Sequence, residues 1–545
     1  MANVKGEIDS MTSGGAGKLT VQPLHFFSFA VYCYCIVEGK RNTMEYYRGK
    51  QRKKHIAALL AGVVCLTQAL LLPVSASCTL LPEDAESDET PLVLVDDTED
   101  ARPDGDFAAL TEAEEDAGPG GYLVGLAEGA EETLIPDGRW EAVFPGVICT
   151  DDPDFARALL ADGLAEYVEE DGAAYLFDTE TAPVKDGWVY EAVDAAYADT
   201  LGLSGEGVRV AVIDSGVDLT NADLQNANIE IGYDYLRGTG KRMRDTMGHG
   251  TEVAQMIAAD RNEKGSTGIA RGVTIVPLLC YDERWSPVSA LVHAIWDAVD
   301  VYHCDIINMS WGTSTDYKTL HEALQYAYES GCILVAAAGN VSYVEPQGTL
   351  SYPAAYDEVI GVGSVAPTMD ISTFSQQTSA VYVCAPGDEV PVWINGREKT
   401  TSGTSFASPC VAAMLALAKE RMPSLTMEEA WQLLQDRAVD RGKAGYDKVF
   451  GYGTIDVRSL LAPSWGCCRQ EGDATILYGW LRTDCRNMAA LYTQNGQLVA
   501  CISLPEQEES DILCYELPQV TGELRCKVFS LDGNYRPTGG TAGSF

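Results

Sequence analysis

The chain has few basic residues and few histidines for its length. Of its 545 residues, 38 are Lys or Arg, 80 are Asp or Glu, and six are His. This acidic balance argues against nucleic acid as a partner and suits a soluble protein that works outside the cell. None of the sixteen cysteines has the CxxC spacing of zinc sites, so zinc is not expected. A chain this long is expected to form two or three domains.

The N-terminal region has the features of an export signal. We interpret residues 1–43 as an over-extended start, because Met44 is followed by a basic stretch and then by the mainly apolar segment Ile56–Leu72. A small-residue cleavage motif ends at Ala76, so residues 44–76 are predicted to be a cleaved signal peptide. The protein is then secreted or at the cell surface. The alternative is an uncleaved signal anchor, which would hold the protein in the membrane.

Two further regions precede the main body of the chain. Residues 77–119 are rich in Asp and Glu, which predicts a disordered acidic linker. Residues 120–177 have the patterns of a small α+β unit. Its strands are expected at Gly121–Leu126, Ala165–Asp171 and Ala173–Phe177, and its helix at Pro153–Asp162.

From residue 188 to 462 strand and helix patterns alternate, which predicts an α/β fold with a mainly parallel sheet. Strands are expected at Val208–Ile213, Cys304–Met309, Cys332–Ala338 and Val359–Val365. Helices are expected at Thr251–Ala258, Pro287–Tyr302, Tyr317–Ser330, Ser405–Lys419 and Thr426–Asp436. Sites in such sheets form beyond the carboxyl ends of strands, where Asp214, Ser310–Gly312 and Asn340 lie.

Residues 463–545 change to β patterns with turn signals such as Asn495-Gly496, which predicts a small all-β domain. Its strands are expected at Thr475–Leu481, Met488–Thr493, Gln497–Leu504, Ile512–Leu517 and Glu523–Leu531. Six cysteines lie in this region, and in a secreted protein they suggest crosslinks.

Ser405 is a candidate nucleophile. It opens an apolar helix pattern, where unpaired N–H groups and the helix dipole favour developing negative charge. A serine there needs a base to take its proton. The alternative is that Ser405 only caps the helix.

His249 is the candidate base, because glycines flank it and let other chains approach the ring closely. A carboxylate must orient such a base. Asp214, at the end of an apolar strand, fits this need, with Asp218 and Asp223 as alternatives in more polar sequence. Asn340 follows a run of small residues and is a candidate donor to an oxyanion, although it could equally be a loop asparagine.

Five motifs together resemble the subtilisin-like serine proteases, or subtilases. They are Val210–Asp218, Gly248–Ala254, Ser310–Gly312, Ala336–Asn340 and Gly403–Pro409. The chain order Asp, His, Ser is that of subtilisin. The resemblance covers roughly residues 188–462 and implies a three-layer subtilisin-like catalytic domain at 178–462, preceded by an inhibitory, folding-assisting propeptide at 120–177. The β domain at 463–545 separately resembles small β domains attached to exported bacterial proteins.

The resemblance also implies roles for individual residues. Asp214 orients His249, which acts as base and then acid; Ser405 is the nucleophile; Asn340 and the Ser405 N–H hold the oxyanion. The implied substrate-binding residues are an edge that pairs with an extended peptide, at Ser310, Trp311 and Gly312, and a pocket lined by Ala338, Gly339 and Ser351. Glu252 and Cys410 stand where the family often has histidine, so packing there is expected to differ.

We therefore expect a secreted serine endopeptidase, made as a zymogen, that acts on proteins or peptides and cleaves itself after Phe177. No cofactor is required. A structural calcium ion is considered without ligands, because the loop Asp260–Thr267 resembles a calcium loop only loosely. The alternative is a non-catalytic peptide-binding or adhesive surface protein on the same fold.

Overall fold

The structure is a computed structural model. It describes residues 121–531, except 128–129, 131–134, 136–139, 178, 182–186, 240–243, 263, 283, 343, 473, 484, 494–495, 506–511 and 518–523. The chain divides into two compact units, Met1–Ala108 and Ala109–Phe545, and everything described below belongs to the second. The expected start, signal and acidic linker lie outside the described residues.

An eight-stranded sheet forms the core of the described chain. Its order is β16-β15-β14-β12-β7-β10-β8, with β9 also paired to β10, and the paired strands run parallel. The strands are β7 (Arg209–Asp214), β8 (Asn228–Ile229), β9 (Tyr233–Asp234), β10 (Thr274–Leu279), β12 (Ile306–Met309), β14 (Ile333–Ala337), β15 (Ile360–Val365) and β16 (Val383–Pro386). The predicted α/β fold with a mainly parallel sheet is confirmed.

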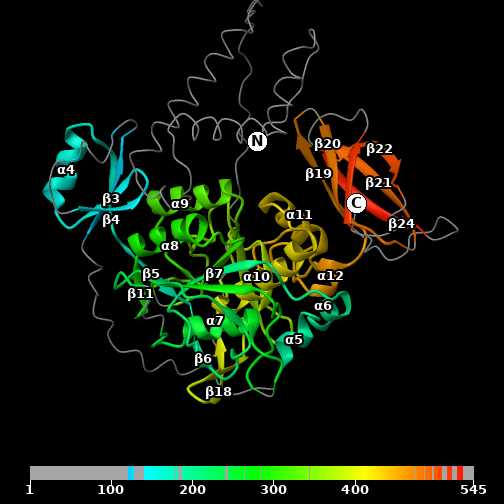
Figure 1. Cartoon of the computed structure of the whole chain (residues 1–545), viewed down its shortest axis with the longest axis horizontal. Coiled ribbons are helices and arrows are strands. Elements are labelled where there is room, and N and C mark those ends of the chain that lie inside the picture. Colours follow the sequence, from blue (N-terminus) through cyan, green and yellow to red (C-terminus); the bar gives the residue numbers. More distant parts are fainter. Residues whose placement is uncertain are drawn as a thin grey trace, which may run out of the picture. The chain divides into compact units, whose positions relative to one another are not determined.

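Helices cover both faces of this sheet. Helices α8 (Val288–Asp300) and α9 (Lys318–Glu329) pack together on one face, and α7 (His249–Ala258) and α10 (Thr404–Arg421) pack together on the other (Figure 1). The other helices of this part are α5 (Trp188–Ala192), α6 (Ala196–Leu201), α11 (Met427–Arg437) and α12 (Val457–Leu461). Helix α10 is buried from Thr404 to Lys419, as its uniformly small and apolar sequence requires.

Strand β10 was not predicted, and Pro277 at its centre explains why. Proline lacks the N–H that a central strand needs. Here the carbonyls of Ile275 and Leu279 accept from Glu230 N and Tyr235 N. Pro277 lies midway between Ile275 and Leu279 and faces the same edge of β10. At this edge the neighbouring strand changes from β8 to β9. The missing N–H therefore falls in a gap of the ladder.

The small α+β unit has a four-stranded sheet of order β2-β3-β1-β4 and one helix. Its elements are β1 (Tyr122–Leu126), β2 (Trp140–Phe144), β3 (Val147–Thr150), α4 (Pro153–Ala161) and β4 (Ala165–Glu170). Strands β2 and β3 were not predicted. The expected strand at Ala173–Phe177 forms as β5 (Ala173–Leu176), but it leaves this sheet and pairs with the α/β part of the chain.

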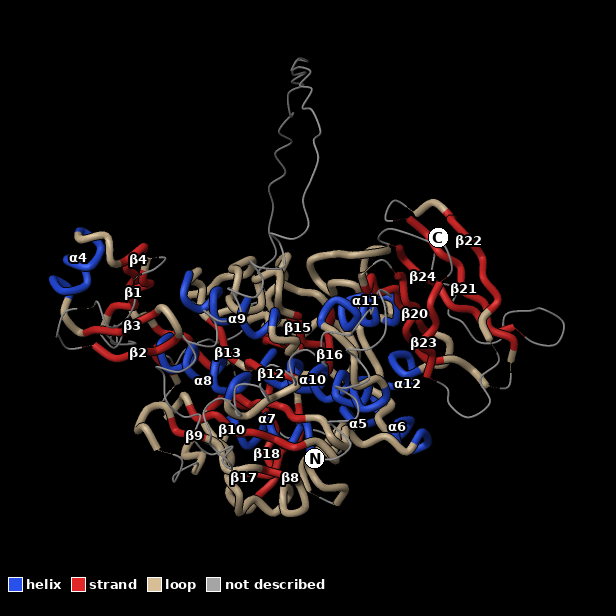
Figure 2. Tube along the Cα trace, turned by 45° about the horizontal axis from the view of Figure 1, so that its top comes forward, coloured by secondary structure: helices blue, strands red, loops and turns tan. Residues whose placement is uncertain are grey.

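The described tail consists of strands and loops (Figure 2). One sheet has the order β19-β20-β23 and the other β22-β21-β24. The strands are β19 (Trp465–Glu471), β20 (Ala474–Trp480), β21 (Arg486–Thr493), β22 (Leu498–Ser503), β23 (Ile512–Leu517) and β24 (Leu524–Leu531). Leu477, Leu491 and Leu513 are fully buried in their shared core.

The suggested crosslinks are absent among five cysteines of the tail, because Cys467, Cys468, Cys501, Cys514 and Cys526 are free thiols. Cys467 and Cys526 are buried, whereas Cys501 and Cys514 are exposed on strands of different sheets. Burial of this kind suits a packed thiol.

Among the described helices, none combines the length and hydrophobicity needed to cross a bilayer.

Candidate active site

Asp214 and His249 meet where strand β7 ends and helix α7 begins. Both side chains are buried, and His249 Nδ1 lies 2.8 Å from Asp214 Oδ1. The same carboxylate oxygen accepts from the Ser215 N–H at 2.7 Å. The two alternatives have other partners, because Asp218 accepts from Thr220 and Asp223 from Asn262. The structure therefore brings Asp214, rather than either alternative, to the imidazole.

Asp245 holds the start of helix α7, and the sequence did not reveal this role. Its carboxylate accepts from the N–H groups of Met247, Gly248 and Thr251 at 2.7–3.0 Å. It also accepts from the Ser215 hydroxyl, which in turn accepts from Gly250 N. Burial raises the pKa of Asp245. This network fixes the turn that carries His249.

Ser405 is the second residue of helix α10, and Pro409 shapes its surroundings. A proline in a helix cannot donate to the carbonyl four residues earlier, which here is that of Ser405. The Ser405 carbonyl instead accepts from the Ser310 hydroxyl at 2.7 Å. The Ser405 hydroxyl donates to the Ser310 carbonyl at 2.8 Å. Ser310 thus anchors the turn that carries the candidate nucleophile.

Two contacts bring the elements of the site together. The His249 ring packs 5.5 Å from the ring of Phe406, the residue after Ser405. Beneath this turn, the Cys410 thiol donates to the carbonyls of Phe406 and Pro386. Burial raises the pKa of Cys410 well above its usual range, so this thiol has a packing role.

Asn340 faces the same turn from the end of strand β14. Its Oδ1 accepts from the N–H and the hydroxyl of Thr404 at 3.1 and 2.9 Å. These bonds direct Nδ2 the other way, and Nδ2 has no hydrogen-bond partner among the described residues. A buried amide without a partner is costly. The unused donor is therefore available to an oxygen atom in the cleft.

The chain's own residues fill this cleft. Strand β5 pairs antiparallel with β11 (Trp285–Pro287) on one side and with β13 (Trp311–Gly312) on the other. Phe177 follows β5, and its N–H donates to Ser405 Oγ at 3.2 Å. A Cβ built on Gly403 would lie 2.1 Å from the Phe177 carbonyl oxygen and 3.3 Å from Asn340 Nδ2. The Phe177 carbonyl thus lies beside Asn340 and the start of α10.

The Phe177 ring occupies a pocket that needs small residues. A Cβ on Gly312 would lie 2.7 Å from the ring and 2.2 Å from Ser351 Oγ. Gly339, at φ +100°, approaches Ser351 from the other side, where a Cβ would be 3.0 Å away. Ala338 packs instead in a small apolar cluster beside Val365, Val381 and Cys384. Gly312 therefore lies against the aromatic ring, with Ser351 beside it and Gly339 next to Ser351.

The chain beyond Phe177 is also held by main-chain pairing. Strand β6 (Thr179–Thr181) pairs antiparallel with β18 (Arg397–Ser402), which pairs in turn with β17 (Val390–Ile394). The residues on both sides of Phe177 thus lie as strands against the α/β part. Neither β11 nor β18 was predicted as a wall of the cleft.

The small α+β unit contacts the α/β part at two helix starts. Glu169 accepts from the N–H groups of Lys318 and Thr319, at the start of α9. Asp171 accepts from the N–H and hydroxyl of Ser289, at the start of α8. Carboxylates at helix N-termini satisfy unpaired donors and match the helix dipole. These two acidic residues therefore cap both helices of one face.

In the described part of the loop considered for calcium, side chains bond to protein partners, and Asp260 accepts from the Asn226 amide at 2.9 Å. Asn262 donates its amide to Asp223 at 2.8 Å, and burial raises the pKa of Asp223 to about 7. Within the described residues, no three His, Cys, Asp or Glu side chains cluster as metal ligands would. Calcium prefers six to eight oxygen ligands. Structural calcium thus stays a prediction without assigned ligands.

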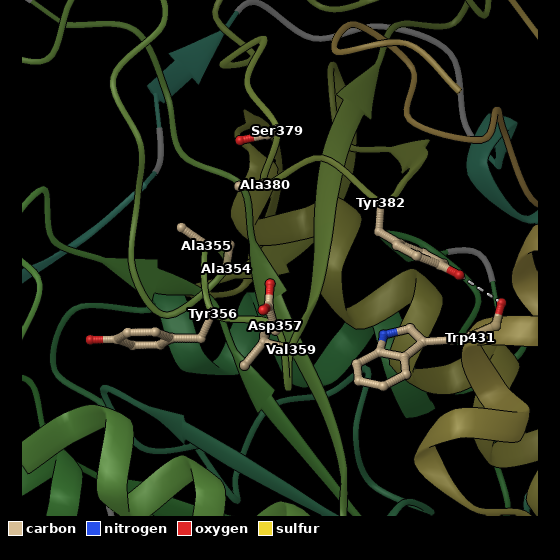
Figure 3. Close-up of a pocket in the computed structure, with 9 residues that line it drawn as sticks. All are labelled: Ala354, Ala355, Tyr356, Asp357, Val359, Ser379, Ala380, Tyr382 and Trp431. Carbon is tan, nitrogen blue, oxygen red and sulfur yellow. Dashed lines mark hydrogen bonds between the residues drawn. The ribbon is translucent and has the colours of Figure 1, made fainter. Parts of the chain in front are cut away.

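A separate surface pocket of about 370 Å³ lies at the start of β15 and against α11. Trp431 and Tyr382 line it, together with Asp357 and Ala380 (Figure 3). Tyr382 donates its hydroxyl to the Trp431 carbonyl. None of the residues proposed for catalysis lines this pocket. The catalytic cleft is already occupied by residues 173–177.

Known proteins resemble this chain in sequence. A family model described as "Subtilase family" matches residues 205–453. The minor extracellular protease Epr of Bacillus subtilis is 35% identical over 352 residues, which are 62% of this chain and 53% of that protein. This chain thus spans about half the length of that relative.

Two other relatives are covered over most of their length. The alkaline elastase YaB of a Bacillus species is 32% identical over 56% of this chain and 77% of its own. Subtilisin DY of Bacillus licheniformis is 34% identical over 47% of this chain and 92% of its own. The chain therefore belongs to the subtilase family of serine endopeptidases.

Proposed function

We propose that this protein is an exported serine endopeptidase, made as a precursor that cleaves itself after Phe177. Asp214, His249 and Ser405 form its catalytic triad, and Asn340 is its side-chain oxyanion donor. The observation that carries the proposal is the chain segment in the cleft, with the Phe177 N–H donating to Ser405 Oγ and strands on both sides.

In the first step Ser405 Oγ attacks the carbonyl carbon of Phe177. Its hydroxyl first turns from the Ser310 carbonyl, its present partner at 2.8 Å, toward His249. The imidazole takes the hydroxyl proton, and Asp214, 2.8 Å from Nδ1, stabilises the imidazolium. Asn340 Nδ2 and the Ser405 N–H donate to the oxyanion.

In the second step the tetrahedral intermediate collapses to an acyl-enzyme. The C–N bond after Phe177 breaks, and His249 gives its proton to the leaving nitrogen. Water, deprotonated by the same imidazole, then attacks the acyl carbon and restores the Ser405 hydroxyl. The product carboxylate belongs to Phe177.

The residues 120–177 then act as an inhibitor until they are degraded. After cleavage, β5 remains between β11 and β13 and blocks the nonprimed side of the cleft. The caps from Glu169 and Asp171 to α9 and α8 add binding energy outside the cleft. Export before activation is consistent with the predicted signal peptide and with the name of the extracellular relative.

The pocket around Phe177 predicts which substrates are cleaved. Gly312 leaves room for a ring, Ser351 lies beside it, and Gly339 allows Ser351 to pack closely. We therefore expect proteins and peptides to be cut after large apolar or aromatic residues. A non-catalytic peptide-binding role is disfavoured, because the side chains that chemistry requires are all present.

N-terminal sequencing of the secreted, active enzyme tests the proposal. We expect a start at Asp178 or within a few residues of it, and an uncleaved, folded precursor in Ser405→Ala. An active enzyme whose chain starts upstream of Tyr122 would show that residues 120–177 are no inhibitor. Cleavage at the same site in Ser405→Ala, without added protease, would exclude Ser405 as the nucleophile.

A further inference from the structure

The hairpin formed by β17 and β18 leads directly into the candidate nucleophile. It ends at Ser402, and Gly403 to Ser405 follow. Strand β18 pairs antiparallel with β6, the strand that follows Phe177. The paired residues are Ser402 and Thr179, Thr401 and Glu180, and Thr400 and Thr181. Counted from the proposed scissile bond, these are the second to fourth residues on its far side. The hairpin is therefore a template for an extended chain past the cut.

This hairpin is fixed to helix α7, which begins with His249. One turn along the helix, Glu252 Oε1 lies 2.7 Å from Lys399 Nζ of β18. One turn further, the Trp393 N–H of β17 donates to Gln255 Oε1 at 2.7 Å, and Gln255 Nε2 donates to the Trp393 carbonyl at 3.1 Å. One helix face thus holds both strands of the hairpin.

The ion pair is the part of this attachment that depends on charge. The Glu252 side chain is 1% exposed and the Lys399 side chain 23% exposed. A buried carboxylate is strongly destabilising unless a cation accompanies it. Lys399 immediately precedes Thr400, which pairs with Thr181, the fourth residue after the proposed scissile bond. Holding Lys399 against Glu252 therefore sets where the far end of the template lies.

We propose that the Glu252–Lys399 pair positions β18 to bind substrates that extend at least four residues beyond the scissile bond. The pair acts through the strand, not on the reacting atoms, so both are positioning residues. This inference rests on the proposed peptidase function. The preferred substrates are long extended segments of proteins, as opposed to peptides that end just past the cut.

The test compares two internally quenched peptides with the same residues before the cut. One ends at the first residue after the scissile bond, and the other continues for four. The variants are Lys399→Met, which removes the cation, and Lys399→Arg, which keeps it. Glu252→Gln also breaks the ion pair, and it leaves no buried charge unpaired, because the partly exposed Lys399 can still reach water. Arg397→Met is the matched control, since Arg397 is exposed on the same strand.

We expect Lys399→Met and Glu252→Gln to lower kcat/KM on the long peptide about tenfold, the effect of one or two main-chain hydrogen bonds. The lower kcat/KM should come from a higher KM with an unchanged kcat, because the pairing with β18 stabilises the bound substrate and the transition state equally. The short peptide should change little, and Lys399→Arg and Arg397→Met should resemble the unaltered enzyme. Titration of active serine counts the folded enzyme in each case.

Equal losses on the two peptides would overturn the inference, because the pair would then act on the catalytic groups or on folding. An unaltered enzyme that does not prefer the long peptide would overturn it as well. If the unaltered enzyme cleaves neither peptide, the proposed function itself fails. The two failures are thus distinguishable.

Discussion

Gly403→Ala tests the position of the scissile carbonyl most locally. The Gly403 backbone is extended, with φ 161° and ψ 156°, a region open to any residue. Alanine is therefore not strained by the backbone. Its Cβ, however, would lie 2.1 Å from the Phe177 carbonyl oxygen. Contacts below about 3 Å do not occur for a Cβ, so the carbonyl must move away.

The size of the effect follows from that displacement. The oxygen must retreat by about 1 Å, and a misplacement of that size costs on the order of 10²-fold in rate. We therefore expect Gly403→Ala to slow self-cleavage of the precursor about 100-fold, and to lower kcat/KM on a peptide substrate by a similar factor. The thermal unfolding temperature should change little, since the carbonyl belongs to a segment in the cleft.

Gel analysis of precursor processing over time, with N-terminal sequencing, measures the rate. Gly121→Ala is a matched control, because a Cβ there meets its nearest atoms at 3.5 Å, an ordinary contact. Processing of Gly403→Ala at the control's rate would refute the position assigned to the scissile carbonyl.

Three more predictions concern the oxyanion donor and the pro-unit. Asn340→Leu should lower kcat by about 10²–10³ with little change in KM, the size seen when subtilisin loses its side-chain donor; steady-state kinetics with unchanged kcat would mean that backbone donors suffice. Glu169→Gln should weaken the cap on α9 by about 1 kcal/mol, measured as faster release of the cleaved pro-unit; an unchanged release rate would contradict the cap. Burial raises the pKa of Asp171 above its ordinary 3.8, so the part of its contribution to stability that depends on protonation is present below pH 3.8 and is lost as pH rises through the raised pKa. The hydrogen bonds that it accepts from Ser289 do not need that proton. The double variant Asp171→Asn, Ser405→Ala should therefore gain free energy of unfolding relative to Ser405→Ala as pH rises above 3.8, measured by denaturant unfolding. A difference between the two that does not change with pH would contradict the raised pKa.

The sequence predicted what short-range chemistry controls. Asp214 ends an apolar strand, His249 lies between glycines, and Ser405 opens a buried helix. Each of these signals is local, and each residue lies at the expected place in the fold. The order of the five motifs along the chain then indicated that these residues act together.

The walls of the cleft depend on long-range pairing, which leaves no local signal. Strand β11 is three residues long and β18 ends in a polar run, so neither has the hydrophobic periodicity of a core strand. The Glu169 and Asp171 caps join residues more than a hundred positions apart. Such contacts become visible only when the fold is known.

The central claim is that Ser405 is the nucleophile of an active peptidase. Labelling of the secreted enzyme with a fluorophosphonate, followed by mass spectrometry of its peptides, tests this claim most directly. We predict a single adduct on Ser405, formed at the same rate at which peptidase activity is lost, and none in His249→Ala. An adduct on another residue, or full activity in enzyme that is labelled at Ser405, would contradict the account.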